Sequence, residues 1–184
     1  MRTDGADPRD RDVWKGDIYE LAMAFAPLDA DALARVLGAV EEFADLRTPK
    51  HGGTRGYVTR LPHGKRIVCR MMAAPIDDSG QFVGLYFPVE ALARVDRRVG
   101  EFLHSYGQEL EWTDHLRDWF RALDDWLAEV ALRVHEVMPM LGGRIGWEHP
   151  VGDYVVTGRP PAKRSRALLV VRDGRVEYLP ANAR

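Results

Sequence analysis

The chain has almost no cysteine. Its one thiol, Cys69, leaves no partner for an intrachain disulfide and cannot supply a zinc site built on several cysteines. No apolar run approaches the roughly 20 residues that a membrane span needs. The opening stretch, residues 1–12, is charged and lacks the apolar core of a signal peptide. These absences predict a cytoplasmic protein that does not associate with a membrane.

Recognisable catalytic signatures are also missing. The sequence contains no Gly-x-Ser-x-Gly elbow and no Walker-type loop. The glycine-rich segment 142–146 follows a predicted helix, so it lacks the helix N-terminus that a phosphate loop serves. His135 and Glu136 open like the zinc-protease motif, but Pro139 stands where the second histidine ligand would be. We therefore expect no metal and no cofactor, and a non-enzyme is favoured over an enzyme.

The longest regular pattern is an amphipathic helix from Thr113 to Met138. Thr113 is a suitable N-cap, because its hydroxyl can accept a hydrogen bond from a free N–H of the first turn. Pro139 ends the helix. A helix of about 39 Å would cross a domain of this size, so we expect it to pack along a sheet. Its apolar positions recur at steps of three and four: Leu116, Trp119, Phe120, Leu123, Leu127, Val130, Ala131, Val134, Val137 and Met138.

The remaining segments predict mostly strands. A helix is expected from Asp29 or Asp31 to about Leu46 and a short one over 89–95, whereas 96–111 shows no clear pattern. The Asp173-Gly174 dipeptide is the strongest hairpin signal in the chain. Segments with strand-like composition or alternation, bounded by turn residues, cover 17–26, 56–61, 66–74, 81–87, 144–148, 153–157, 166–172 and 175–179.

The order of the elements, β-α-β-β-β-α-β-β-β, predicts an α+β fold. Strands joined by hairpins form an antiparallel sheet, and two main amphipathic helices suit one face of it, as in a ferredoxin-like variation. Residues 1–15 are rich in Asp, Arg and Gly, which predicts a disordered N-terminal lead-in. The rest, 16–184, is expected to form a single α+β domain.

Charge is unevenly distributed along the chain. Seven basic residues and no acid occur from Arg47 to Arg70, and a loop near Arg164 adds further basic residues. If these segments lie together, they form a positive face that suits nucleic acid, a phosphate ligand or an acidic protein. Alternatively, the charges are solvated and protect a sheet edge from pairing. The candidate ligand-binding residues are Arg60, His63, Arg66, Arg70 and Arg164.

Three other features have both a functional and a structural interpretation. Neighbouring arginines could activate Cys69 as a nucleophile, although a lone cysteine in a strand is ordinarily a core residue. Trp119 and Trp126 lie seven residues apart and belong either to the core or to a partner surface. The acids of the long helix could share acid–base work or bind a metal, but a solvated outer face is favoured; they include Asp114, Asp118, Asp125 and Glu129.

These patterns favour a non-catalytic protein that binds another protein. A homodimer is one such arrangement, because the late hairpin ending at Leu179 could supply an edge strand. Nucleic-acid or phosphate-ligand binding through the arginine-rich hairpin is the first alternative, disfavoured because Tyr57 is the one aromatic residue nearby that could stack on a base. An enzyme with a site invisible in sequence is the second. The excess of arginine over lysine suggests a bacterial, GC-rich genome.

Overall fold

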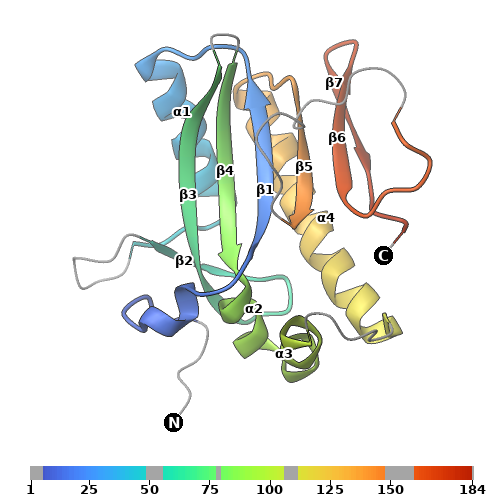
Figure 1. Ribbon diagram of the computed structural model, residues 1–184. Coiled ribbons are helices and arrows are strands. Elements are labelled where there is room, and N and C mark those ends of the chain that lie inside the picture. The colour runs from blue at the N-terminus through green and yellow to red at the C-terminus, as the bar shows by residue number, and fades with distance from the viewer. Residues whose placement is uncertain (1–5, 49–55, 78–79, 106–111, 148–159, 184) are drawn as a thin grey trace.

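The computed structural model describes residues 6–48, 56–77, 80–105, 112–147 and 160–183 (Figure 1). Its elements follow the predicted order closely. They are the 3-10 helix η1 (Arg11–Trp14), β1 (Ile18–Phe25), α1 (Ala30–Phe43), β2 (Tyr57–Arg60), β3 (Arg66–Asp77), β4 (Gly80–Pro88), α2 (Val89–Val95), α3 (Arg97–His104), α4 (Asp114–Val137), β5 (Gly142–Trp147), β6 (Ala167–Arg172) and β7 (Arg175–Leu179).

Within the described residues, seven strands form one open antiparallel sheet in the order β2-β3-β4-β1-β5-β6-β7. β1 is the central strand, with β4 on one side and β5 on the other. The elements β1-α1-β3-β4-α4-β5 therefore have the β-α-β-β-α-β order of a ferredoxin-like unit, in which β4 separates β1 from β3. β2 extends this unit at one end and β6–β7 at the other. The predicted α+β fold with an antiparallel sheet is confirmed.

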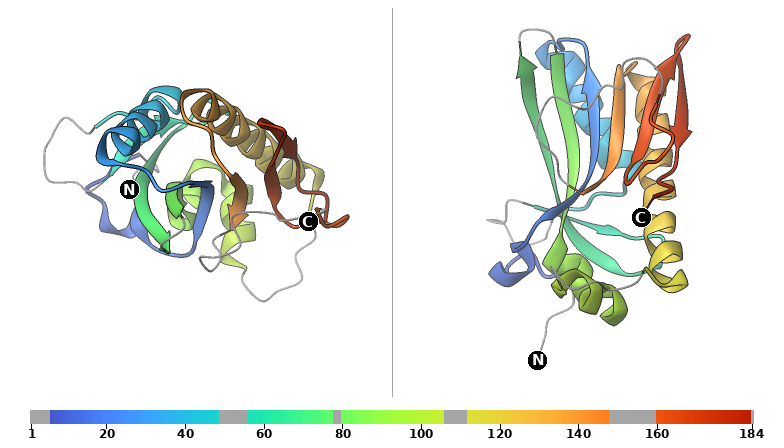
Figure 2. Two further views of the ribbon diagram at one scale, coloured as in Figure 1. Left: turned by 90° about the horizontal axis from the view of Figure 1, so that it is seen from above. Right: turned by 45° about the vertical axis from the view of Figure 1, so that its right-hand side comes forward.

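Helices α1 and α4 lie on the same face of the sheet (Figures 1 and 2). Leu123 and Leu127 of α4 and Val36 of α1 are fully buried in one core with Leu21 of β1. The predicted cap is present, since the Thr113 hydroxyl accepts the N–H of Leu116 at 3.3 Å. The three-and-four spacing thus predicted the existence of α4 and the side that it buries, except at Val137, which is 41% exposed.

The opposite face of the sheet carries a smaller apolar cluster. Ala22 and Ala24 of β1 are buried there with Phe82 and Tyr86 of β4. The two rings close over Gly84, because a Cβ at this position would lie 2.6 Å from the ring of Phe82 and 2.8 Å from that of Tyr86. Small residues on the central strands therefore let aromatic side chains lie flat on this face.

Part of the predicted N-terminal lead-in packs against the domain. Val13 of η1 is fully buried, and the indole N–H of Trp14 donates to the carbonyl of Pro8 at 3.0 Å. The carboxylate of Asp10 accepts from Arg94 of α2 at 2.6 Å. Two apolar side chains, Val13 and Trp14, thus anchor part of a segment whose average composition is charged.

Three segments differ from or lie beyond the sequence expectations. The stretch that showed no clear pattern contains α3, whose first turn is capped by Asp96: its carboxylate accepts the N–H groups of Arg98 at 2.8 Å and Val99 at 3.3 Å. β5 begins at Gly142, because the chain re-enters the sheet directly after the end of α4. The strand predicted over 153–157 lies outside the described residues.

Candidate functional site

The candidate basic residues of the β2–β3 hairpin are exposed. Arg60 and Arg66 face each other across the hairpin, and a guanidinium nitrogen of Arg60 donates to the carbonyl of Gly64 at 2.8 Å, which braces the turn. The guanidinium of Arg70 lies 4.3 Å from the ring centre of Trp14 in η1, a cation–π contact. Two of these three arginines, Arg60 and Arg70, therefore already make contacts with other groups of the chain.

Arg164 lies in the segment that precedes β6. In the sheet order, β4, β1 and β5 separate β3 from β6, so the structure does not bring Arg164 together with Arg66 and Arg70. Its guanidinium donates to the carbonyls of Pro180 at 3.3 Å and Pro161 at 2.9 Å. Arg164 thus ties the C-terminal segment to the chain before β6. A ligand-binding role for any of these arginines stays a prediction.

His63 lies in the β2–β3 turn and stacks on Trp119 of α4. The ring centres are 4.8 Å apart and the planes differ by 8°. Partial burial of the imidazole lowers the pKa of His63, and the positive charge that His115 can carry acts in the same direction. The neighbouring Asp96 carboxylate opposes this shift. His51 lies outside the described residues.

The residues with other possible chemistry have structural contacts. The Cys69 thiol is fully buried, and this burial raises its pKa, which disfavours the thiolate. His135 accepts the N–H of Met140 through Nδ1 at 3.1 Å, and its Nε2 lies 3.2 Å from the carbonyl of Gly174. His135 therefore links the end of α4 to the β6–β7 turn. In the part of the chain that the structure describes, no group of three or more His, Cys, Asp or Glu residues could hold a metal ion.

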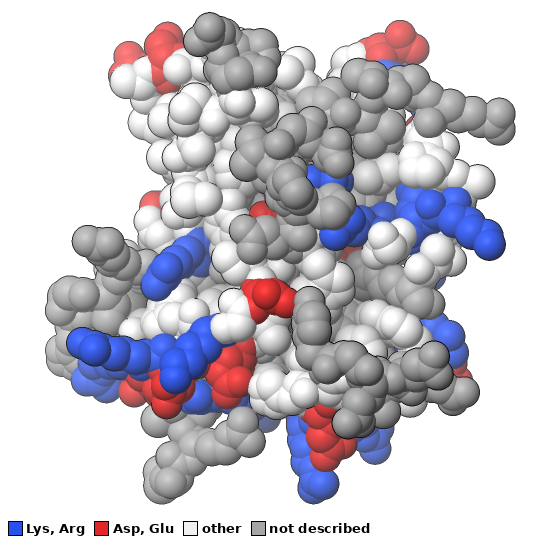
Figure 3. Space-filling model, viewed as in Figure 1, with Lys and Arg blue, Asp and Glu red and all other residues white. Residues whose placement is uncertain are grey.

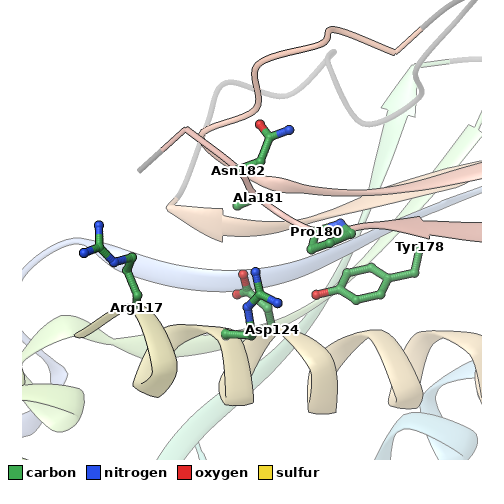
Figure 4. Close-up of a pocket in the computed structure, with 7 residues that line it drawn as sticks. Arg117, Asp124, Tyr178, Pro180, Ala181 and Asn182 are labelled. Carbon is green, nitrogen blue, oxygen red and sulfur yellow. The ribbon is translucent and has the colours of Figure 1, made fainter. Parts of the chain in front are cut away.

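A pocket of about 310 Å³ lies between α4 and the C-terminal segment (Figure 4). Figure 4 shows Arg117 and Asp124 on the side of α4 that faces this segment. The hydroxyl of Tyr178 donates to Asp125 at 2.8 Å and holds β7 against the helix. The lining residues are Arg117, Arg121, Asp124, Tyr178, Pro180, Ala181 and Asn182.

The sequence pattern singled out none of the pocket-lining residues, and Asp124 is the buried one among them. Its side chain is 2% exposed and accepts a hydrogen bond from the hydroxyl of Tyr19 on β1. The sequence does contain a signal: Asp124 lies four residues after Phe120 and three before Leu127, which is an apolar position of the helix. A carboxylate at a buried position must be hydrogen-bonded to be tolerated.

Two further buried charges lie on the opposite face of the sheet. Glu20 of β1 is 3% exposed and Arg144 of β5 is 7% exposed. Glu20 pairs with Gly146 and Ala22 pairs with Arg144, so the two charged side chains occupy diagonal positions on the same face. Glu20 interrupts an apolar strand, and that interruption was a readable signal.

Among the described residues, the C-terminal part of β3 presents an open edge. β2 pairs with β3 through Cys69, and β4 occupies the other side, so from Arg70 onwards no described strand lies on the β2 side. Met72 on this stretch is 51% exposed, more than any other large apolar residue in the described ranges. The segment 71–75 contains no charged residue. β2 thus covers the N-terminal part of this edge, and no described strand covers the C-terminal part.

No protein-family model matches the chain, and no match is found among curated proteins or solved structures. None of the helices in the described part combines the length and the apolar character that crossing a bilayer requires.

Proposed function

We propose that this chain is a non-catalytic, cytosolic interaction protein whose protein partner adds a strand to the open edge of β3. The observation that carries this proposal is the uncharged edge beside Met72, which is half exposed. An unpaired strand edge offers a row of N–H and C=O groups to another extended chain. Exposed methionine suits such a contact, because its flexible side chain adapts to different partners.

The neighbouring elements define how long the added strand can be. β2 occupies the edge up to Cys69, and Pro75 has no N–H to donate to a ladder. Because proline is tolerated where its nitrogen faces outward, Pro75 and, by alternation, Ala73 and Met71 direct their main-chain groups away from β4. The free stretch is therefore Arg70–Ala74, which spans roughly 16 Å.

The chemistry of this stretch defines the partner segment. The side chains of this stretch on the open face of the sheet are Arg70, which lies over the ring of Trp14, Met72 and Ala74. The partner should place apolar side chains against Met72 and Ala74. Over β3 and β4 the upper part of this face shows little charge in Figure 3, whereas Lys and Arg side chains lie toward its lower end. An extended, uncharged segment of another protein fits this surface better than an acidic peptide or a nucleic acid does.

The test compares three forms of the tagged protein in pull-downs from the organism that encodes it. Met72→Lys places a charge on the open edge, and Leu132→Lys is the matched control, because Leu132 is an exposed apolar residue of α4, 37% exposed. We expect a partner that binds the wild-type and Leu132→Lys proteins and is lost with Met72→Lys. Recovery of no specific partner, or of partners indifferent to Met72→Lys, would refute the proposal.

A second copy of the chain could also fill the edge. Two β3 strands related by a two-fold axis at Met72 would pair Met71 of one copy with Ala73 of the other. Sedimentation or light scattering distinguishes this case: a dimer that Met72→Lys dissociates and Leu132→Lys does not would assign the edge to self-association in place of a different partner protein.

The second candidate function is binding of nucleic acid or a phosphate ligand at the β2–β3 turn. It is favoured by the exposure of Arg60, Lys65 and Arg66 within one hairpin. Such binding must weaken steeply as salt increases, because counterions compete for the phosphates. Absence of binding to DNA, RNA or inorganic phosphate at low salt, or binding that is indifferent to salt, would eliminate this candidate.

A further inference from the structure

We propose that the pocket between α4 and the C-terminal segment binds a small molecule that carries one carboxylate and a hydrogen-bond donor on the neighbouring carbon. This chemistry is shared by α-amino acids and α-hydroxy acids. The pocket lies beside β7, at the opposite end of the sheet from β3, so the inference is independent of the partner proposed for the β3 edge.

The carboxylate of the ligand is expected to bind two arginines of α4. Arg117 and Arg121 are four residues apart on α4, so their side chains lie on the same side of the helix, and both line the pocket. Guanidinium groups bind carboxylates through paired, charge-assisted hydrogen bonds. Arg117 already pairs with the exposed Asp114 at 2.8 Å, whereas Arg121 makes no ion pair with any other described residue. Arg121 is therefore the primary anchor.

The hydrogen-bond donor of the ligand is expected to bind the carboxylate of Asp124. Asp124 lies about one turn after Arg121 on α4 and lines the same pocket. The Tyr19 hydroxyl donates to its carboxylate and fixes its orientation. A carboxylate can accept several hydrogen bonds, so it can receive an ammonium or hydroxyl group of the ligand besides that of Tyr19. Its negative charge, with Asp114 and Asp125 close by on the same helix, opposes a polyanion. The charges favour a ligand with one negative group over a polyphosphate.

The wall opposite α4 is held in place before any ligand binds. Asn182 accepts the N–H of Arg164 through its side-chain oxygen at 2.8 Å, and its side-chain nitrogen donates to Ala162 at 3.0 Å. The main-chain N–H of Asn182 donates to the carbonyl of Arg164 at 2.9 Å. A wall fixed in this way costs little ordering on binding. The volume of about 310 Å³ is at the small end for ligand pockets, which suits a molecule of amino-acid size.

The experiment is a titration of the isotope-labelled protein with L-alanine, L-lactate, acetate and inorganic phosphate, followed by amide chemical shifts. We expect saturable shifts with L-alanine or L-lactate, in the millimolar range or tighter, concentrated in 117–124 and 178–182. Acetate, which lacks the donor, and phosphate should bind more weakly. Preference for L-alanine assigns the ligand to amino acids, and preference for L-lactate assigns it to hydroxy acids.

Three variants test the assignment. Arg121→Gln should weaken binding at least tenfold, the loss expected for a charge-assisted hydrogen bond. Ala181→Leu fills the pocket without changing its charge and should weaken binding too. Arg35→Gln removes an exposed arginine of α1 and should change nothing. The proposal is overturned if neither L-alanine nor L-lactate gives saturable shifts in the pocket, if phosphate binds more tightly than both, or if Arg121→Gln binds like Arg35→Gln.

Discussion

Replacing Tyr19 by phenylalanine removes one hydroxyl from the interface between β1 and α4. The ring stays, so its contacts with Phe120, at 5.4 Å between ring centres, and with Trp147, at 5.0 Å, are retained. The change takes from the buried Asp124 carboxylate the donor that Tyr19 supplies. The effect on stability therefore isolates one hydrogen bond to a buried charged group.

The expected loss follows from this environment. A hydrogen bond to a charged group contributes about 1.5–3 kcal/mol, and at 2% exposure the Asp124 carboxylate gains little from water in place of the lost donor. In a domain of this length, 1 kcal/mol changes the melting temperature by about 2–4 °C. We therefore expect Tyr19→Phe to lower the free energy of unfolding by about 2 kcal/mol and the melting temperature by roughly 4–8 °C.

Tyr178→Phe is the matched control. Its hydroxyl also donates to an aspartate of α4, Asp125, but that bond is exposed to solvent. Water can replace the lost donor there, so the cost should remain within about 0.5 kcal/mol. Urea unfolding followed by circular dichroism measures both variants. If Tyr19→Phe is no less stable than Tyr178→Phe, the buried bond does not stabilise the contact between β1 and α4 as argued.

Three further predictions concern packing and titration. Gly143→Ala should destabilise the domain by about 1–3 kcal/mol in urea unfolding, because the added Cβ would lie 2.6 Å from a main-chain oxygen. Gly38→Ala on α1 is the control: its Cβ meets nothing within 4 Å, so it should stabilise the domain, and equal effects of the two variants would contradict this packing. Cys69 should react with a thiol reagent at neutral pH when the protein is unfolded and not when it is folded, and rapid reaction of the folded protein would refute its burial. Hydrogen bonding to Glu41 raises the pKa of Tyr57 to about 12. The stability that this hydrogen bond contributes should therefore persist below pH 10 and be lost as pH rises toward 12. An ultraviolet titration in which Tyr57 ionises near pH 10 would contradict this prediction.

Local signals in the sequence predicted most of the elements. The period of α4, the turn at Asp173-Gly174 and the short helix over 89–95 depend on neighbouring residues, and each was found where expected. α3 was missed because its periodic stretch is only eight residues long and strongly charged. Its stability comes from the Asp96 cap and from packing against α2, and the second of these is not visible in a local window.

The pairing of distant strands could not be predicted from the sequence. Hairpin turns identify β3–β4 and β6–β7, but nothing local indicates that β1 lies between β4 and β5. The pocket could not be predicted for the same reason. It forms between α4 and a segment some sixty residues later in the chain, a separation that no local pattern spans. Asp124 was recognisable as an anomaly in the apolar pattern, yet its partner Tyr19 on β1 was not.

The central position of β1 has a consequence for synthesis of the chain. β1 leaves the ribosome well before its neighbour β5, which starts at Gly142, more than a hundred residues later. At about 5–20 residues per second, β1 waits several seconds for that neighbour. During this interval one side of the future central strand has no partner, and pairings this distant along the chain form slowly. The nascent chain therefore passes through a stage in which its central strand is exposed to aggregation, and we expect chaperone dependence to be greatest before β5 emerges.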